Sequence, residues 1–371
     1  MQHIEIIIVG GGLAGLIAAH QLAKKGKEVL LIEKKTYPFH RVCGEYISNE
    51  VKPFLLREGL FPEYLDHAQI SKFELSSVYG KSAEIPLDLG GFGISRYALD
   101  EFLYQKAKNE GAQFLLQTQV DDLKFLQKED RFELLTNSGQ KLSCKHLIGA
   151  FGKRSKVDKL LQRDFIHQRS PYIGVKYHIQ TDAVDPQTVA LHNFEGGYCG
   201  VNRVENNTFN LCYLGSKAQL KKYGNIPDME EAVLHQNPKL RDIFHNSTFL
   251  FEKPEVINEI SFSPKKPVEN HLLMAGDAAG LIAPLCGNGM AIAIQTGKMA
   301  AEAILSSHDR STIEKTYASE WNKIFKQRLW IGRTVQRLFG SDHLSKLAVG
   351  MVVHSPALAT AIMKRTHGQA F

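Results

Sequence analysis

The chain has 371 residues, of which 43% are hydrophobic and 23% are charged, the proportions of a soluble globular protein. Its net charge of +6 comes without a long basic run, which argues against nucleic acid as a partner. No uninterrupted apolar stretch reaches the length that a bilayer requires, so we expect no spanning helix. The five cysteines are scattered without a CxxC pair, which argues against a disulfide framework or a zinc site and for a reducing compartment, so we expect a cytoplasmic protein.

The first thirty-three residues predict a dinucleotide-binding unit. A buried strand over residues 4–9 is followed by glycines with GxGxxG spacing, a helix over residues 13–23 and a second strand over residues 29–32. Such glycines allow a tight turn, bring backbone N–H groups close to a pyrophosphate and pack the helix against the sheet, and an acid after the second strand accepts a hydrogen bond from a ribose hydroxyl. An ordinary βαβ turn without a ligand is the alternative. The residues expected to bind the cofactor are Gly10, Gly12, Leu13, Ala14, Gly15, Glu33 and Lys34.

The next segment, residues 34–48, contains Pro38 and Gly44 and is predicted to be a loop. It follows the second strand and therefore lies at the carboxyl edge of the sheet, where ligands of open α/β sheets bind. Cys43 lies in this loop, and the residue five positions later is Ser48. A cysteine pair of the glutathione reductase type is therefore excluded here.

The central part of the chain predicts a helix followed by many strands. The helix covers residues 96–111, and strands over 113–116, 120–126, 132–136 and 141–144 form an antiparallel meander that leads to a buried strand at 147–150. From about residue 171 to 263 alternating strands, the last of them over residues 249–263, predict a mostly antiparallel sheet, with Asn206-Asn207 as a hairpin turn and helical pieces between residues 217 and 244.

The last part of the chain returns to the nucleotide domain. A strand over residues 271–275 is followed by a glycine-rich loop, a helix to about residue 305 and a long helix to about residue 339. The first of these helices is rich in small residues that allow close packing on a sheet, and its amino terminus can face an anion. Ser311 and Glu314 predict a capping box at the start of that long helix, and residues 342–371 predict a helical tail.

The predicted fold class is α/β: a Rossmann-like parallel sheet with an antiparallel β-meander, into which an α+β substrate domain with a mostly antiparallel sheet is inserted. Residues 1–75, 96–165 and 266–310 are assigned to the discontinuous nucleotide domain. Residues 76–95 and 166–265 form the substrate domain, and residues 311–371 form the carboxyl-terminal helical segment.

Three separated motifs resemble one superfamily of flavoproteins. They are GGGLAG with Glu33, GISRYALDEFL around Arg96, and LLMAGDAAGLIAPLCGNGMAIAIQTG at residues 272–297. They are similar to the FAD-binding elements of the para-hydroxybenzoate hydroxylase type, which covers aromatic hydroxylases, flavin halogenases and geranylgeranyl reductases. The resemblance implies noncovalent FAD, with Asp277 near the ribityl chain and pyrophosphate and the turn from Gly287 to Met290 facing the flavin pyrimidine.

The loop RVCGEYIS resembles the CGE loop of the geranylgeranyl reductases, which implies that Arg41, Cys43, Gly44 and Glu45 lie near the flavin ring. Cys43 could instead be a small apolar filler. The further residues that the resemblance implies for FAD binding are Arg41, Cys43, Gly44, Arg96, Val120, Gly152, Gly276, Asp277, Pro284, Gly287, Asn288, Gly289 and Met290.

The differences from the sequence signatures of that superfamily limit the reactions that can be expected of this chain. The two tryptophans, Trp321 and Trp330, both lie near the carboxyl end, so neither the WxWxIP signature of halogenases nor the YxWxFP signature of geranylgeranyl reductases is present in the substrate sheet. Residues 197–202, which include Tyr198, stand where that signature would fall, and they carry glycine at the position expected for tryptophan. This predicts a wider pocket than that of a prenyl reductase. Phe151-Gly152 replaces the Asp-Gly pair of hydroxylases that use NADPH.

The leading hypothesis is an FAD-dependent oxidoreductase that moves hydride between the flavin and a bulky lipophilic or aromatic small molecule. A flavin monooxygenase that hydroxylates an aromatic or polyketide-type substrate is the second hypothesis, and a flavin-binding protein without turnover is the third. Cys43 and Tyr198 are the candidate catalytic residues, with Asn202 and Arg203 as further pocket candidates.

The sequence does not determine which molecule donates electrons to the flavin or whether the protein contacts a membrane. No second GxGxxG follows the first, so NAD(P)H would bind only transiently, or a partner reductase would supply electrons. The segment from Trp321 to Phe371 mixes apolar and basic residues. Peripheral membrane contact is one interpretation, and a helix packed on its own protein is the other.

Overall fold

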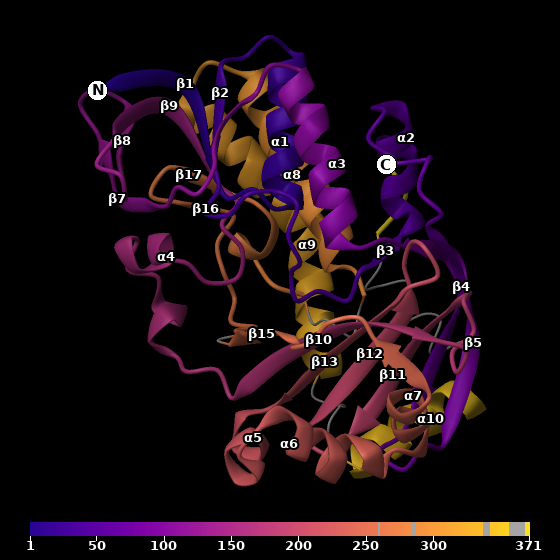
Figure 1. Cartoon of the computed structure of the whole chain (residues 1–371). Coiled ribbons are helices and arrows are strands. Elements are labelled where there is room, and N and C mark those ends of the chain that lie inside the picture. The colour runs from indigo at the N-terminus through magenta and orange to yellow at the C-terminus, as the bar shows by residue number, and fades with distance from the viewer. Residues whose placement is uncertain (259, 283–286, 337–341, 356–367) are drawn as a thin grey trace.

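The computed structural model describes residues 1–258, 260–282, 287–336, 342–355 and 368–371, and it places two sheets one above the other (Figure 1). The first sheet has the order β16-β17-β9-β1-β2-β6, with β7 and β8 attached through β9. Its strands are β1 (Gln2–Val9), β2 (Val29–Ile32), β6 (Gln113–Leu115), β7 (Val120–Leu126), β8 (Arg131–Thr136), β9 (Lys141–Gly149), β16 (Val268–Glu269) and β17 (Leu272–Met274). The pairs β1·β2, β1·β9, β2·β6 and β9·β17 are parallel, so the predicted Rossmann-like sheet with an antiparallel meander is confirmed.

Three helices gather on one side of this sheet (Figure 1). They are α1 (Leu13–Lys24), α3 (Arg96–Asn109) and α8 (Gly289–Ser306), and α9 (Arg310–Gln336) packs against α8. The small residues predicted to allow close packing bring α8 against α1: a Cβ atom on Gly297 would lie 2.3 Å from the backbone oxygen of Ala14. The first sheet and these helices share one hydrophobic core.

The second sheet is the predicted mostly antiparallel one. Its order is β14-β10-β13-β12-β11-β4-β5-β3, and β15 pairs with β10. Its strands are β3 (Tyr46–Ser48), β4 (Ala68–Ser76), β5 (Ser82–Gly93), β10 (Tyr172–Thr181), β11 (Thr188–Phe194), β12 (Gly197–Arg203), β13 (Phe209–Ser216), β14 (Ser247–Phe249) and β15 (Glu255–Asn258). β3, and β4 except for its last residue, lie within the segment 1–75 that was assigned to the nucleotide domain, yet both strands belong to this sheet.

Helices cover the second sheet on the side away from the first sheet. They are α5 (Lys217–Tyr223), α6 (Ile226–Val233) and α7 (Pro238–His245), while α10 (Asp342–His354) packs on β4 and β5. The alternation of β10 explains the two faces: Ile173, Val175, Tyr177 and Ile179 join the core beneath α6 and α7, so the residues between them face the first sheet. The short elements are α2 (Lys52–Arg57), α4 (Lys156–Leu160), η1 (Asn49–Val51), η2 (Asp164–His167), η3 (Leu234–Gln236) and η4 (Gly276–Ala278).

Two local predictions were wrong. The amide of Thr312 donates to the carboxylate of Asp309 at 2.8 Å, so Asp309 takes the capping role predicted for Ser311, and Glu314 contacts His271 instead. The strand predicted over residues 249–263 is interrupted between β14 and β15, where Pro254 has no N–H to donate to a ladder. The Asn206-Asn207 turn is confirmed, with φ of 54° and 53°. Among the described residues no helix combines the length and the apolar composition that crossing a membrane requires.

Candidate active site

A cavity of about 750 Å³ lies between the two sheets and has two chemically different ends. The nucleotide end is formed by the carboxyl edge of the first sheet and the amino termini of α1 and α8. The apolar end lies against the second sheet and α10. Its lining includes Phe73, Leu75, Ile85, Leu87, Val189, Leu191, Leu214, Ile260, Leu281, Ala348, Met351 and Val352.

The amino terminus of α1 opens into the nucleotide end. Gly12 is the residue that precedes the helix, and it offers no side-chain cap to the first-turn N–H groups. A Cβ atom on Gly12 would meet only the Nη2 atom of Arg96, at 3.6 Å, so this glycine borders open space. Gly10 and Gly15 serve packing instead: a Cβ atom on Gly10 would lie 2.3 Å from the Ala150 oxygen, and one on Gly15 would lie 2.0 Å from the Gly10 oxygen.

Glu33 ends β2 at the edge of the same space. Its side chain is buried, and its Oε2 atom accepts a hydrogen bond of 2.8 Å from the amide of Gly11. Its Oε1 atom accepts one of 3.1 Å from the amide of Lys35. The backbone therefore holds a carboxylate beside the glycine turn, where a ribose would lie.

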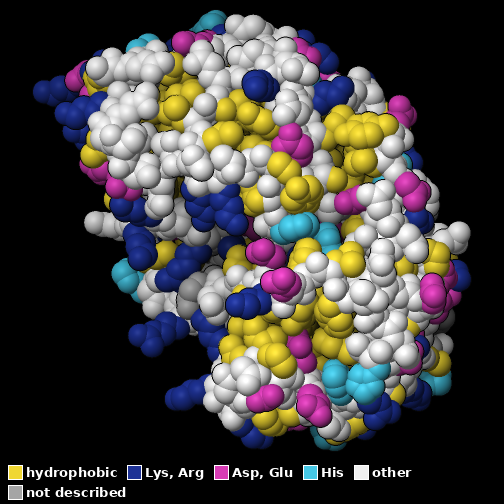
Figure 2. Space-filling model, viewed as in Figure 1, with side chains coloured by type: hydrophobic (Ala, Val, Ile, Leu, Met, Phe, Trp, Pro, Cys, Tyr) yellow, Lys and Arg dark blue, Asp and Glu magenta, His cyan; other side chains and the backbone are white. Residues whose placement is uncertain are grey.

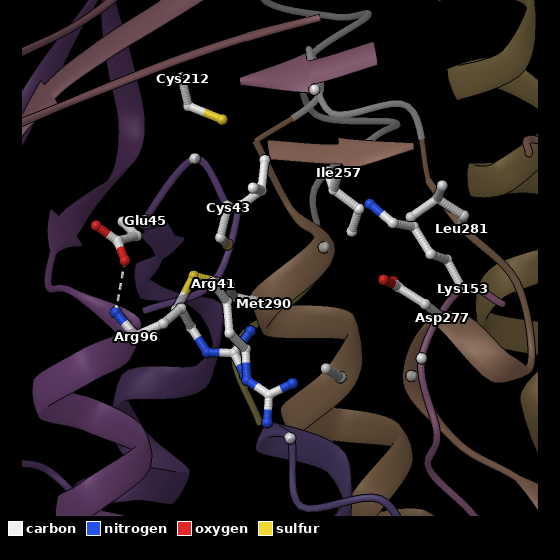
Figure 3. A pocket seen from close by; sticks show the side chains of 18 of the residues that line it. Arg41, Cys43, Glu45, Arg96, Lys153, Cys212, Ile257, Asp277, Leu281 and Met290 are labelled. Carbon is white, nitrogen blue, oxygen red and sulfur yellow. Dashed lines mark hydrogen bonds between the residues drawn. The ribbon is translucent and has the colours of Figure 1, made fainter. Parts of the chain in front are cut away.

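Two guanidinium groups lie side by side at the floor of the cavity (Figure 3). Arg96 makes two hydrogen bonds of 2.7 Å to the carboxylate of Asp100, and the Nε atom of Arg41 donates to the same carboxylate at 3.0 Å. Burial alone would lower the pKa of Arg96, but the Asp100 carboxylate outweighs this and raises it. Both arginines line the cavity as permanent cations, which suits a diphosphate.

The Cys43 loop is fastened to the second sheet by a buried charge cluster. The carboxylate of Glu45 accepts hydrogen bonds from the Nζ atom of Lys176 at 2.5 Å and from the amide of Arg96 at 2.7 Å, and it lies 2.7 Å from the Nε2 atom of His178. The carbonyl of Gly44 accepts a hydrogen bond of 2.9 Å from the side chain of Asn210. Glu45 adopts a φ of 53°, so the loop turns sharply at the residue that holds it.

This cluster fixes the ionisation of Glu45. Burial would raise the pKa of the carboxyl group, but the charge of Lys176 and the hydrogen bonds from His178 and Lys176 outweigh it and lower the pKa to about 2. Glu45 and Lys176 are fully buried, so their charges must compensate each other. Cys43 is half-buried on the same loop, is a free thiol and lines the cavity.

Asp277 lies in η4, directly after β17, and its side chain faces the cavity. Burial raises the pKa of its carboxyl group, against the charges of Lys153, Lys265 and Arg96, which lower it. The Nζ atom of Lys265 donates to the backbone oxygens of both Lys153 and Asp277, each at 2.8 Å. This lysine therefore ties the loop after β9 to the loop after β17.

The cavity collects most of the residues that the sequence analysis assigned to the site. Gly15 is not among the lining residues because it packs on Gly10, and Asn288 is buried at the start of α8. Pro284 lies outside the described residues. The predicted residues that line the cavity are Gly10, Gly12, Leu13, Ala14, Glu33, Lys34, Arg41, Cys43, Gly44, Arg96, Val120, Gly152, Tyr198, Gly276, Asp277, Gly287, Gly289 and Met290.

Sequence reasoning missed Lys153 and Cys212 among the lining residues, and it missed Lys176 and His178 behind the Cys43 loop. Lys176 and His178 could have been found, because they alternate with apolar residues along a predicted strand and so share its inward face. Lys153 directly follows Phe151-Gly152 at the carboxyl edge of the first sheet, the edge where ligands bind. Cys212 alternates in the same way with Leu211 and Tyr213 along β13, so its inward position could also have been predicted.

These features together fit a flavin dinucleotide. The uncapped helix start at Gly12 and the two arginines suit the diphosphate, and the carboxylate of Glu33 suits a ribose. A second helix, α8, also begins at the cavity: its first two residues, Gly289 and Met290, line the wall. One helix terminus is thus available for the diphosphate and another for the electron-rich side of a reduced ring.

The comparison with protein families decides the cofactor: the family described as FAD binding domain matches residues 3–328. The chain belongs to this family. The menaquinone reductase of Mycobacterium tuberculosis is 23% identical over 349 residues, covering 90% of this chain and 82% of that protein. The geranylgeranyl diphosphate reductase of Rhodobacter capsulatus is 27% identical over 322 residues, covering 81% of this chain and 75% of that protein.

A solved structure of this kind shares the fold. PqsL of Pseudomonas aeruginosa, described as a probable FAD-dependent monooxygenase, has a TM-score of 0.75 at 16% identity, covering 93% of this chain and 99% of PqsL. The present FAD-binding chain is therefore an FAD-dependent oxidoreductase. The hypothesis of a flavin-binding protein without turnover is set aside.

Proposed function

We propose that this oxidoreductase moves hydride between FAD and a carbon–carbon bond of a lipophilic small molecule. The observation that carries the proposal is the apolar end of the cavity, which continues directly from the nucleotide end. Its walls are aliphatic and aromatic side chains from four strands and α10, which suit a hydrocarbon chain or ring system. The likeness to two reductases, of menaquinone and of geranylgeranyl diphosphate, supports the same direction.

Bound FAD supplies the hydride chemistry, and the protein groups position the reactants around it. Gly12, Glu33, Arg41 and Arg96 are proposed to hold the dinucleotide. The predicted contribution of Asp277 to the ribityl chain stays part of the same proposal.

The second sheet is proposed to supply the surface on which the substrate lies. Tyr198 and Gly200 on β12 line the cavity, and a Cβ atom on Gly200 would meet only the Cys212 oxygen, at 3.7 Å. This bare stretch of strand leaves room close to the Cys43 loop. Cys43 and Tyr198 are therefore proposed to contact the substrate at its reacting end.

Hydroxylation of an aromatic or polyketide-type substrate is the second candidate function. The fold likeness to PqsL favours it, whereas Phe151, which lines the cavity in place of an aspartate, does not supply the polar group of NADPH-using hydroxylases. Either NAD(P)H binding transiently or a partner reductase is proposed to deliver the electrons.

Peripheral membrane contact is also a proposal. Trp330 on α9 and Leu347 on α10 are each 61% exposed, and α10 also closes the apolar end of the cavity. A lipophilic substrate could thus pass from a membrane surface to the cavity along α10. Flotation of the holoenzyme with anionic liposomes tests this, and no association at low salt would rule it out.

The reaction itself is tested with the reduced holoenzyme mixed anaerobically with a series of lipophilic alkenes and unsaturated quinones. We expect flavin absorbance to return without oxygen and the product to gain two hydrogens. Return of absorbance only with oxygen, with a hydroxylated product, would favour the second candidate.

A substitution in the cavity wall tests whether the substrate occupies the apolar end. Ala348 on α10 is buried and lines the cavity, so Ala348→Phe should shorten the apolar end and shift the preference toward smaller substrates. Leu347→Phe, which enlarges a neighbouring side chain that points to solvent, should leave the preference unchanged.

A further inference from the structure

A lysine lies inside the cavity, and no carboxylate among the residues that the structure describes forms an ion pair with it. Lys153 follows β9, and its side chain extends past Asp277 toward Ile257 and Leu281, residues that line the apolar end (Figure 3). Its backbone oxygen accepts a hydrogen bond from Lys265, so the start of this side chain is fixed. The ammonium group thus lies at the junction of the two ends of the cavity.

The charges around Lys153 do not neutralise it. Asp277 faces it, but no carboxylate of the described residues lies within ion-pair distance of its Nζ atom, and Lys265 supplies a second cation to the same neighbourhood. The thiols of Cys43 and Cys212 line the same cavity. Burial lowers the pKa of Lys153, as expected for an ammonium group removed from water without a bound anion.

Lys176 shows how a fully buried lysine is neutralised in this protein. Lys176 is fully buried and donates to the Glu45 carboxylate at 2.5 Å. The neighbouring cations of the Lys153 loop are also engaged: Lys156 pairs with Asp121 at 2.9 Å, and Arg154 donates to the backbone oxygen of Ile166 at 2.7 Å. Lys153 therefore differs from both its buried counterpart and its chain neighbours.

The surface around this part of the cavity favours anions. Figure 2 shows Lys and Arg side chains gathered beside α4, around a hollow between the two halves of the molecule. Lys153, Arg154 and Lys156 line the cavity on this side. A negatively charged ligand would be attracted toward this side of the cavity.

We propose that Lys153 binds a single anionic oxygen group, a carboxylate or a phosphate monoester, on an otherwise apolar substrate. This inference rests on the proposed function, because it assumes that the hydrocarbon part of the substrate fills the apolar end. The anion would meet the ammonium group through a charge-assisted hydrogen bond in a site with little water, and the chain would extend toward Leu75, Leu191 and Val352. The site thus selects substrates that carry one anionic group at the end nearest the flavin.

The experiment compares three probes of equal chain length in the FAD-loaded enzyme: dodecanoate, dodecyl phosphate and dodecanol, titrated by calorimetry. We expect the wild type to bind at least one anionic probe about tenfold tighter than dodecanol, and the two anions to show whether carboxylate or phosphate is preferred. Lys153→Met should abolish the preference, and Lys153→Arg should retain it. Lys159→Met, which changes an exposed lysine of α4, is the matched control and should behave as the wild type.

Two results would overturn the inference. One is equal or absent binding of the anionic probes by the wild type. The other is a preference that survives in Lys153→Met, above all if that variant releases FAD more readily, since Lys153 would then serve the cofactor phosphates. The probes are saturated and undergo no turnover, so failure of this test leaves the alkene experiment unaffected, and failure of the alkene experiment leaves this one standing.

Discussion

Replacing Glu45 by glutamine should destabilise the protein, because it leaves the ammonium group of Lys176 buried without its anion. Both side chains have 0% exposure, so solvent screens neither charge. The pKa of Glu45 falls from 4.5 to about 2 in the folded protein, and at roughly 1.4 kcal/mol per unit this corresponds to about 3 kcal/mol of stability at neutral pH. Removal of one partner from a buried ion pair costs about 3–5 kcal/mol, which agrees with that estimate.

The pH dependence has a definite sign. The folded pKa of Glu45 lies below its ordinary value, so its contribution is present above pH 4.5 and is lost as the pH falls toward 2. The difference in the free energy of unfolding between the wild type and Glu45→Gln should therefore be largest at neutral pH and should shrink in that acidic window.

Urea unfolding of the FAD-saturated proteins measures these differences. The control is Glu302→Gln, because Glu302 pairs with Lys298 at 2.7 Å on α8 but is 53% exposed, and it should cost no more than about 0.5 kcal/mol. The double variant Glu45→Gln with Lys176→Met should recover part of the loss. A loss for Glu45→Gln no larger than that of the control, or a double variant whose loss equals the sum of the single losses, would refute the compensation argument.

Two further predictions concern the cores. Gly297→Ala should destabilise the protein by about 1–3 kcal/mol, because the new Cβ atom would lie 2.3 Å from the backbone of α1. The control is Gly350→Ala on α10, where a Cβ atom would meet nothing within 4 Å, and it should be neutral or stabilising. Equal stability of the two variants in thermal unfolding would contradict this prediction. Burial raises the pKa of Glu230 to about 7, so its contribution is present at low pH and is lost as the pH rises through 7. Glu230→Gln should therefore match the wild type near pH 5 and exceed its stability at pH 8 by about 1–3 kcal/mol in urea unfolding, and an equal difference at both pH values would show that another group is responsible.

The sequence allowed the first sheet and its glycines to be predicted because their signals are local. The apolar run of β1, the GxGxxG spacing and the acid at Glu33 each depend on neighbouring residues, and all lie where that pattern requires. The alternation of β10 to β13 likewise predicted the second sheet. Such elements can be predicted because one period or one turn specifies each of them.

The rest of the site depends on contacts between distant segments. Glu45 pairs with Lys176 although they are 131 positions apart, and the residues around each of them give no indication of the other. β3 and β4 each pair with β5 in the second sheet, although β2, the strand that precedes them in the chain, belongs to the first. The role of α10 as a wall of the cavity depends in the same way on its packing against β4 and β5, which no periodicity within the helix specifies.

The position of that wall in the chain has a consequence for biosynthesis. The residues proposed to hold the dinucleotide, with the two helix starts that face it, all lie before residue 294, whereas the wall is formed by Ala348, Met351 and Val352. Chains leave the ribosome amino terminus first. Every residue proposed to hold the cofactor is thus translated before the helix that forms the far wall, so a nascent chain carries its dinucleotide-binding residues before that wall exists.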